Sequence, residues 1–476
     1  MDENENLKLT EEQQNSLDFE TLHDRRLDEM TALLEDKKMK QLQLLLEDSD
    51  EFEVAEFLTE LSDPQMAMVF RMLSKEQAAA VFAELETDDQ EYIINSITDS
   101  ELGGILDELY LDDTVDMMEE LPASVVKRVM RIATPDTRKL INQYLNYPEN
   151  SAGSIMTAEY IDLKKYMSVK EAFARIRRIG ADKETIYTCF VTSGDRKLEG
   201  IVSVRDLIMA DEDAVIETIM DENVLFCTTT DDQEDVSGIF SDYDLLAVPV
   251  VDREKRLVGI VTVDDVMDVM EQEATEDMEI MAAITPSDKP YSRTSVFDIW
   301  KNRFPWLLLL MLSATFTSMI LTSFEDALAV QAALIAFIPM LMGTGGNSGS
   351  QASTAVIRSL SIGDTELKDV FRVLWKELRV AAMCGITLAV INFVKLFLID
   401  RFLLGNDGVT VLVAMTVCIT IFFVVIFAKV VGCTLPLLAE RIGIDPAVMA
   451  APLISTLTDA ISLLIYFAIA KTLLHI

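Results

Sequence analysis

The sequence contains few of the residues on which most enzymes and disulfide-stabilised proteins depend. Its 476 residues include two histidines, His23 and His475, and five cysteines, none of them in a CxxC pair. Scattered cysteines fit reduced thiols in the cytosol or the membrane better than a disulfide framework or a zinc site. The sequence also has no P-loop, no nucleophile elbow and no HExxH motif. We therefore expect that this chain is not an enzyme.

Basic residues are also scarce, and their distribution divides the chain. Lys and Arg number 40 against 80 Asp and Glu, for a net charge of −40. From Tyr291 onward there are 12 acidic and 13 basic residues, which leaves 68 and 27, a charge of −41, before that point. Such a polyanion repels a phosphate backbone, so we expect no nucleic-acid partner. The split predicts a large acidic aqueous region joined to a nearly neutral apolar one.

Long apolar runs occur only in the last part of the chain. A helix needs about 20 apolar residues to span a bilayer, and five segments qualify: roughly 304–323, 327–357, 380–399, 409–428 and 446–470. A bundle of buried soluble helices would need charged outer faces, which these segments lack. We therefore predict a multi-pass protein of the lipid bilayer.

Basic residues near the span ends indicate the orientation of this region. If the N-terminus is inside, the inner ends carry Lys301, Arg303, Arg358, Lys368, Arg372, Lys376, Arg379 and Arg441, whereas the outer connections are mostly acidic. The N-terminal sequence MDENENLKLTEEQQ has no apolar core typical of a secretory signal. We expect a cytosolic N-terminal region, five spans and a C-terminus outside the plasma membrane.

The second span is rich in glycine and carries two amides. Its centre reads PMLMGTGGNSGSQ from Pro339 to Gln351. Glycine and proline weaken a helix, and irregular backbone at membrane depth is tolerated only inside protein or beside water. Asn347 and Gln351, one turn apart, favour water and therefore a polar lining of a pore. The alternative is a regular helix that packs through small residues, because Gly345 and Gly349 have GxxxG-like spacing.

The last span contains a single charge, Asp459, near its midpoint. A carboxylate at that depth is costly and by default marks an ion path or a proton relay. Two copies in a dimer would form a negative ring suited to a cation. The alternative is that Asp459 is neutralised by protonation or by a lysine such as Lys429. The span opens with Asp445 and Pro446, which predict an acidic N-cap.

Two internal repeats organise the acidic region. Apolar residues recur every twelve positions from Leu61 to Leu121, and four S/T-x-x-E/Q motifs begin at Ser62, Ser74, Thr87 and Thr98. This pattern predicts capped one-helix repeats stacked into a solenoid. After Ser151, GIVSVRDL at 200–207 recurs as GIVTVDDV at 259–266. These copies resemble a tandem pair of CBS domains. The resemblance implies adenine-nucleotide binding, such as ATP, with Arg205 and Asp206 near the ribose and phosphate.

An acidic helix is expected between this pair and the first span. Asp265, Asp268, Glu276 and Glu279 lie on neighbouring faces at helical spacing. A run of like charges is usually a solvated linker. The second interpretation is a cation-binding surface, because clustered carboxylates are the hard-oxygen ligands that Mg²⁺ or Ca²⁺ prefers.

The order of these segments resembles the MgtE family of magnesium channels and transporters. The matching motifs are YPENSAGSIMT at 147–157, EATED at 273–277, PMLMGTGGN at 339–347 and DPA at 445–447 followed by TLTD at 456–459. The resemblance implies a homodimer with five membrane helices per subunit that passes Mg²⁺ inward. Residue 451 is Ala where some members have Asn, which puts polar contacts to the ion's water shell there in doubt.

The fold class that follows is a multidomain α-helical membrane protein. We divide it into an acidic mobile segment (1–50), a helical solenoid (51–150), two CBS domains of α/β fold (151–213 and 214–270), an acidic plug helix (271–292) and a five-helix transmembrane domain (293–476).

The resemblance also implies two sets of Mg²⁺ ligands. The pore set comprises Asp459, Asn347, Gly346 and Asp445. The regulatory set comprises Asp112, Asp116, Glu234, Asp244, Asp265, Asp268, Glu273, Glu276 and Asp277. Together they predict a Mg²⁺ influx channel that cytosolic Mg²⁺ closes. Two alternatives remain open at this point: a proton-coupled divalent cation transporter, and a membrane-anchored CBS nucleotide sensor without transport.

Overall fold

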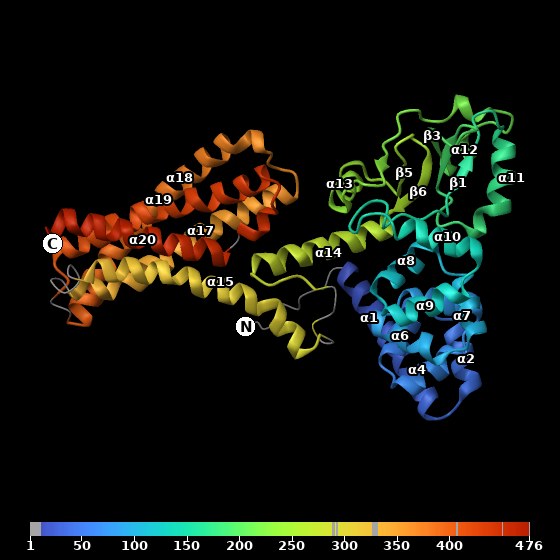
Figure 1. Cartoon of the computed structure of the whole chain (residues 1–476), viewed down its shortest axis with the longest axis horizontal. Coiled ribbons are helices and arrows are strands. Elements are labelled where there is room, and N and C mark those ends of the chain that lie inside the picture. The colour runs from blue at the N-terminus through green and yellow to red at the C-terminus, as the bar shows by residue number, and fades with distance from the viewer. Residues whose placement is uncertain are drawn as a thin grey trace, which may run out of the picture. The chain divides into compact units, whose positions relative to one another are not determined.

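The computed structural model describes residues 11–287, 291, 294–325, 332–405, 408–449 and 451–475. The chain forms two compact units that divide between Val269 and Met270, which we call the N-terminal unit and the C-terminal unit. Figure 1 shows the helical solenoid and the two small sheets of the first unit, and the long helices of the second.

The solenoid has one short helix per twelve-residue repeat, as the sequence predicts. The helices are α3 (Glu51–Thr59), α4 (Asp63–Phe70), α5 (Lys75–Ala83), α6 (Thr87–Ser96), α7 (Asp99–Leu106), α8 (Leu111–Glu120), α9 (Ala123–Ile132) and α10 (Pro135–Tyr144). Each is too short to be stable alone, so buried residues such as Phe57, Phe82 and Ile93 stabilise it by packing between neighbours.

Three of the four predicted caps are present. The Ser62 and Thr98 capping boxes form, and Ser74 Oγ accepts a hydrogen bond from the Gln77 amide. The prediction at Thr87 is wrong, because the cap position of α6 is Glu86 and Thr87 is already helical. The buried Gln90 amide instead donates to the Phe82 carbonyl at 3.0 Å.

Much of segment 1–50, which the sequence predicts to be mobile, is helical in the structure. Residues of this segment form α1 (Glu11–Glu35) and α2 (Met39–Glu47). Met30, Leu42 and Leu46 are buried in the same apolar core as the solenoid. This burial outweighs the polar composition of the segment. Residues 1–10 lie outside the described residues.

Two three-stranded sheets confirm the α/β pair. The first contains β1 (Ile161–Leu163), β2 (Thr188–Thr192) and β3 (Leu198–Ser203), and the second β4 (Cys227–Thr228), β5 (Ala247–Val251) and β6 (Leu257–Thr262). In each sheet the first two strands are parallel and the last two antiparallel. Thr157 bridges to Ile260 and Ile201 to Asp221, so each half also pairs with chain that leads into the other half.

The helices of this pair cover the sheets. They are α11 (Val169–Ile179), η1 (Gly180–Asp182), α12 (Val204–Met209), η2 (Ile216–Thr218) and α13 (Gln233–Tyr243). Apolar residues of the second sheet, including Val248 and Val261, belong to the same core as the solenoid, whereas β1–β3 and α11 have a core of their own. The solenoid and the second CBS domain are therefore continuously packed.

The acidic helix is α14 (Val263–Met281), which differs in extent from the predicted plug helix at 271–292. It begins directly after β6, because Val266 and Val269 are buried and anchor its first turns. It ends at Met281, followed by Ala283 with φ of 55°. Residues 288–290, within the predicted range, lie outside the described residues.

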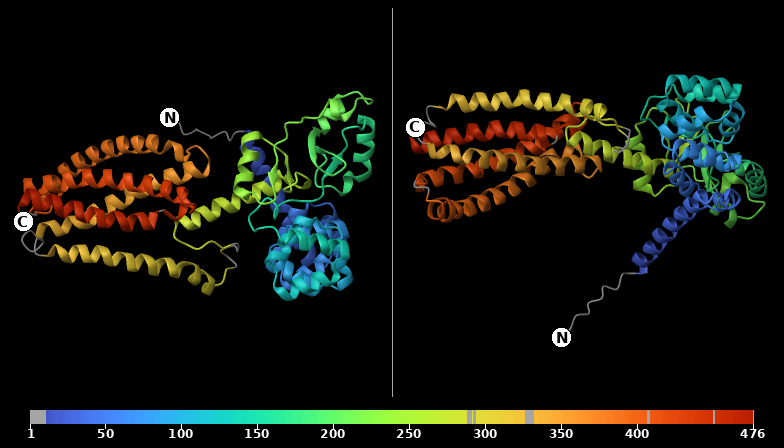
Figure 2. Two further views of the ribbon diagram at one scale, coloured as in Figure 1. Left: turned by 45° about the horizontal axis from the view of Figure 1, so that its top comes forward. Right: turned by 90° about the horizontal axis from the view of Figure 1, so that it is seen from below.

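The C-terminal unit contains five long helices in the part that the structure describes. They are α15 (Val296–Ser323), α17 (Ile338–Ser361), α18 (Val370–Lys395), α19 (Val411–Arg441) and α20 (Ala451–Leu474), with shorter turns η3 (Ala332–Phe337), η4 (Leu367–Asp369), η5 (Leu396–Leu403) and η6 (Pro446–Met449). Figure 2 shows α15 along one side of the bundle. Four helical segments, those of α15, α18, α19 and α20, are long and apolar enough to span a membrane.

The helix α17 shows the backbone of the glycine-rich span, whereas the polar lining at Asn347 and Gln351 stays a prediction. It is a regular α-helix from Ile338 to Ser361, so the expected irregular backbone is wrong for these residues. A Cβ at Gly345 would lie 2.5 Å from Ser462 Oγ, and one at Gly349 would lie 2.7 Å from Ile454 Cγ2. The glycines therefore let α17 pack closely against α20, which confirms the small-residue packing face.

We predict that Gly432→Ala destabilises the C-terminal unit. A Cβ at Gly432 would overlap the Gly349 carbonyl, so α19 and α17 must separate, at a typical cost of about 1–3 kcal/mol. The midpoint of thermal unfolding in detergent, followed by tryptophan fluorescence, should fall. The control is Gly343→Ala, because a Cβ there meets nothing within 4 Å and alanine favours a helix by about 1 kcal/mol. Equal midpoints for the two variants would contradict the packing argument.

Candidate functional site

The first candidate site lies where α17 packs against α20. Gly346 is buried, and a Cβ there would lie 2.7 Å from Ser455 Oγ. Ser455 precedes Asp459 by four residues on α20, so the two side chains share a face of the helix. The neighbouring Asn347 is exposed on α17, and Asp459 is partly exposed. The structure therefore brings Gly346 and Asp459 to the same seam between helices.

Lys429 does not neutralise Asp459. The Lys429 side chain is buried in α19, and its Nζ lies 3.6 Å from Glu377 Oε2 on α18. The charges of Lys429 and Glu377 therefore compensate each other inside the bundle. The alternative in which Lys429 pairs with Asp459 is thus not supported.

A second candidate site lies where the end of α14 meets the end of α17 and η6. Ile280 and Met281 pack against the buried Ile357 and Ala447. Beside this contact, Ser361 Oγ donates a hydrogen bond to the Asp277 carboxylate at 3.3 Å. Burial and the nearby Asp445 carboxylate raise the pKa of Asp277. Two predicted ligands, one from the pore set and one from the regulatory set, therefore lie close enough to repel each other.

Asp445 also has a local structural role. Its Oδ1 accepts a hydrogen bond from the Ala447 amide at 2.7 Å. This contact confirms the predicted acidic cap, although the turn that it caps is the short η6 and not α20 itself. The Ser353 hydroxyl of α17 donates to the Met449 carbonyl at 2.8 Å, which fixes η6 against α17.

The third candidate site is a cluster of carboxylates within the N-terminal unit. Asp112 on α8 is 7% exposed. Burial and the charges of Asp113, Asp265 and Glu184 raise its pKa well above the ordinary value. For the same reasons the pKa of Asp113 rises to about 6 and that of Glu184 to about 7. We call Asp112, Asp113, Glu184 and Asp265 the carboxylate cluster.

The position of Asp265 in this cluster follows from its place at the start of α14. Thr262, the last residue of β6, donates a hydrogen bond from its hydroxyl to Asp265 Oδ2 at 2.5 Å. Burial raises the pKa of Asp265 to about 6, although this hydrogen bond opposes the shift. Beside the cluster, partial desolvation and the charge of Asp268 raise the pKa of Glu84.

Two carboxylate oxygens of the cluster are buried without a hydrogen-bond partner in the described part of the chain. They are Asp112 Oδ1 and Glu184 Oε2. A buried anion without a partner is costly. Carboxylate oxygens that accept no hydrogen bond are hard ligands suited to a divalent cation such as Mg²⁺. However, no group of three or more ligands in the described part of the chain has the geometry to hold one ion directly. A cation with its water shell would still fit this donor chemistry.

Sequence reasoning missed two members of the carboxylate cluster. Asp113 adjoins the predicted Asp112, so only the burial of its side chain distinguishes it from a solvated residue. Glu184 follows η1 in the first CBS domain, and its amide donates to the Glu159 carbonyl at 2.9 Å. No repeat or motif marks Glu184 in the sequence.

The remaining predicted regulatory residues are distributed along exposed surfaces. Asp116, Glu234, Asp244 and Glu276 are exposed, and Glu273 is partly exposed. Asp244 terminates α13 in a left-handed conformation, with φ of 51°. The structure does not test the assignment of these residues to Mg²⁺.

The predicted nucleotide residues lie at the start of α12. Arg205 and Asp206 are both exposed. Asp206 forms a capping box with Ser203, whose side chain accepts a hydrogen bond from the Asp206 amide at 3.0 Å. Its carboxylate therefore already has a structural partner, which a ribose hydroxyl would have to share.

Family models match most of the described architecture. The MgtE model, described as a divalent cation transporter, matches residues 338–469. The MgtE intracellular N domain matches residues 49–150, and CBS domains match residues 152–213 and 216–272. The matched segments follow one another along the chain as the solenoid, the CBS pair and the apolar helices do.

Individual relatives give the same result. A magnesium transporter MgtE of Thermus thermophilus is 40% identical over 369 residues, which cover 77% of this chain and 80% of the relative. A magnesium transporter MgtE of Bacillus subtilis is 31% identical over 82% of this chain and 84% of the relative. A crystal structure of the soluble part of a magnesium transporter matches 53% of this chain and 99% of its own, with TM-score 0.50 and 30% identity. The chain therefore belongs to the MgtE family of divalent cation transporters.

Proposed function

We propose that this protein transports Mg²⁺ across a cell membrane through a pathway that contains Asp459. The observation that carries the proposal is the position of this carboxylate, partly exposed on the apolar helix α20 and beside the Gly346 contact with α17. The relatives named magnesium transporters support the choice of ion.

The chemistry of the seam suits a hydrated dication. Mg²⁺ dehydrates reluctantly and usually keeps several waters. A carboxylate together with amide and hydroxyl groups can contact the water shell, so the ion does not have to lose all of its waters. Ser455 lies at the Gly346 contact one turn before Asp459, and Asn347 follows Gly346 in α17.

We further propose a homodimer with a cytosolic N-terminal unit, five spans per subunit and an outward C-terminus. Two copies would place two Asp459 carboxylates around one axis and double the local attraction for a cation. The distribution of Lys and Arg at the span ends supports this orientation. The chain's five long helices support the number of spans, since α17 is long enough at 24 residues although it is less apolar than the others.

Gating by cytosolic Mg²⁺ follows from the two acidic sites of α14. Asp265 belongs to the carboxylate cluster near the start of this helix, and Asp277 lies near Asp445 towards its end. Without a cation, repulsion opposes both contacts. Mg²⁺ ions that bridge the carboxylates would stabilise both, hold α14 against the ends of α17 and η6, and close the pathway. Cations shift such an equilibrium only through their differential affinity for the two states.

Binding of ATP or another adenine nucleotide at Arg205 and Asp206 stays a separate prediction. Both side chains are accessible at the start of α12. A nucleotide there would act on the first CBS domain and is not required for the transport that we propose.

We predict that Asp459→Asn abolishes Mg²⁺ uptake into proteoliposomes. The substitution keeps the size of the side chain and removes the charge that attracts the cation. Uptake should fall to the level of protein-free liposomes in a fluorescent Mg²⁺ indicator assay. The matched control is Glu366→Gln, because Glu366 is exposed between α17 and α18.

Unchanged Mg²⁺ uptake by the Asp459→Asn variant would refute the pathway assignment. A flux in the unsubstituted protein that follows an imposed proton gradient would indicate the proton-coupled transporter instead.

We predict that Asp277→Asn weakens closure by Mg²⁺. Neutralising this residue removes one of the two carboxylates that a cation would bridge at the end of α14. The variant should stay open at a Mg²⁺ concentration that closes the unsubstituted channel, as measured by ion flux against Mg²⁺ on the side of the N-terminal unit. Glu271→Gln on the same helix is the control, because Glu271 is exposed. If both variants close at the same concentration, Asp277 is not a sensor.

We predict that the Mg²⁺-free protein loses stability as the pH rises from about 5 to about 8. The folded-state pKa values of Asp113 and Asp265, about 6, and of Glu184, about 7, lie above those of the unfolded chain. Protonation of these groups therefore favours the folded state at low pH, and this contribution is lost as the pH passes through 6 to 7. Differential scanning calorimetry should show the decrease.

Millimolar Mg²⁺ should restore more stability at the higher pH than at the lower, since it then replaces protons as the counterion. The double substitution Asp113→Asn with Asp265→Asn should flatten the pH dependence, whereas Asp107→Asn, at an exposed position on the solenoid, should not. A pH dependence that the double substitution leaves intact would place its origin elsewhere.

A further inference from the structure

A cavity of about 360 Å³ opens in the first CBS domain. Its walls come from the segment before β1, from β1 and β2, from α11 and from the turn that joins β2 to β3. The polar lining residues are Tyr160, Asp162, Arg175, Lys183, Thr192 and Arg196. Arg205 and Asp206 do not line it, so this cavity is separate from the predicted nucleotide position.

The charge of this cavity is opposite to that of its surroundings. Arg175, Lys183 and Arg196 line it together with one carboxylate, Asp162. In the region before Tyr291, by contrast, acidic residues outnumber basic ones by 68 to 27. A positive lining in so negative a region attracts an anion only at close range, because the field of the surrounding carboxylates repels it at longer distances.

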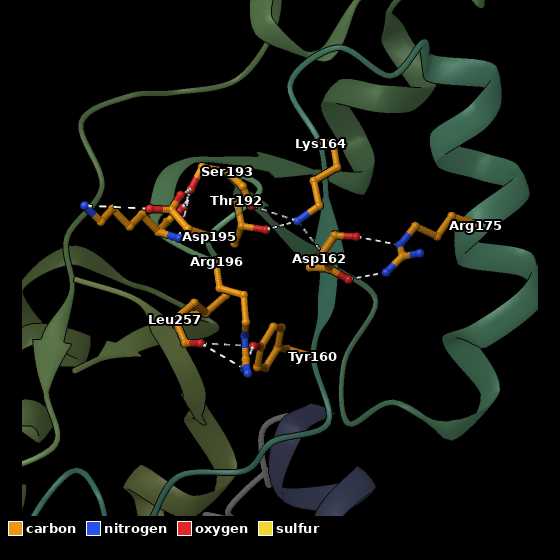
Figure 3. Close-up of polar contacts among 10 residues, drawn as sticks. Tyr160, Asp162, Lys164, Arg175, Thr192, Ser193, Asp195, Arg196 and Leu257 are labelled. Atoms are coloured by element: carbon orange, nitrogen blue, oxygen red, sulfur yellow. Dashed lines mark hydrogen bonds and ion pairs between the residues drawn. The ribbon is translucent and has the colours of Figure 1, made fainter. Parts of the chain in front are cut away.

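The single carboxylate of the lining is neutralised by its neighbours. Figure 3 shows Asp162 between Lys164 and Arg175. Arg175 donates from Nε to the Asp162 carbonyl at 2.7 Å and from Nη2 to its carboxylate. Lys164 Nζ lies 3.2 Å from Asp162 Oδ2. Asp162 therefore holds Arg175 in place and does not cancel the positive charge of Lys183 and Arg196.

The cations of the lining keep donors for a ligand. Arg196 uses Nη2 for the Tyr160 hydroxyl and the Leu257 carbonyl, both at 3.2 Å, as Figure 3 shows. A guanidinium has five N–H donors in total. None of the described residues forms an ion pair with Lys183, which is partly buried. The Thr192 hydroxyl accepts a hydrogen bond from Lys164 Nζ at 2.6 Å, so the hydroxyl proton of Thr192 points away from Lys164.

We propose that this cavity binds a small phosphate-bearing molecule. Phosphate offers several acceptor oxygens to converging Arg and Lys donors, and the planar guanidinium matches its geometry. The volume lies at the lower end of the range of 300–1,000 Å³ typical of small-molecule sites, which favours a sugar phosphate or a free phosphate over a larger ligand. Ala158 and Ile179 supply apolar wall for the uncharged part of such a molecule.

The test is isothermal titration calorimetry of the full-length protein in detergent with ribose 5-phosphate and, separately, with inorganic phosphate. Mg²⁺ is omitted, so the result does not depend on the proposed transport. We expect ribose 5-phosphate to bind and uncharged ribose not to bind. Binding of inorganic phosphate with equal affinity would identify the free anion as the ligand, and weaker binding would identify the sugar phosphate.

The variant Lys183→Gln distinguishes this cavity from other sites. It should weaken binding about tenfold or more, because one charge-assisted contact is lost. It breaks no ion pair with a described residue, so the fold should be retained. Lys170→Gln, exposed on α11 outside the cavity, should bind like the unsubstituted protein. Equal binding by Lys183→Gln, loss of binding in Arg205→Gln alone, or no binding of either phosphate would overturn the proposal.

Discussion

Repulsion between buried carboxylates is the constraint on which the N-terminal unit depends. Asp112, Asp113, Glu184 and Asp265 come from three different elements and share one partly desolvated region, where their pKa values are raised. The continuous apolar core of the solenoid and the second sheet holds the elements of Asp112, Asp113 and Asp265 there against this repulsion. Any cation that binds the folded cluster more tightly than the unfolded chain stabilises this arrangement through mass action.

The arrangement of charged groups differs in the C-terminal unit. In its bundle, the buried Lys429 pairs with Glu377, whereas Asp459 is the one charge in the middle of α20. Packing through glycine brings α17 close to both α19 and α20. Close packing fixes the backbone around Asp459, the carboxylate that we propose attracts the transported cation.

The helix α14 contains residues of both units. Asp265 and Asp277 both belong to this helix. Burial and the charges of nearby carboxylates raise the pKa of both aspartates, so the same ion type can stabilise both ends. A helix transmits such a constraint along its axis because its backbone hydrogen bonds do not stretch appreciably. In the gating that we propose, α14 links cation binding to the ends of α17 and η6.

Features that repeat along the chain, or that occur once, could be predicted from the sequence. The twelve-residue period predicted the solenoid helices, the duplicated GIV motif predicted the two sheets, and the lone charge of the last span singled out Asp459. Tertiary structure decided what depends on contacts between distant residues: the burial of Met30 and Leu42, the regular helix at Gly345 and Gly349, the partner of Lys429, and the place of Glu184 beside Asp265. Local periodicity reports which face of an element is buried, but the identity of the group that covers that face depends on chain segments far away in the sequence.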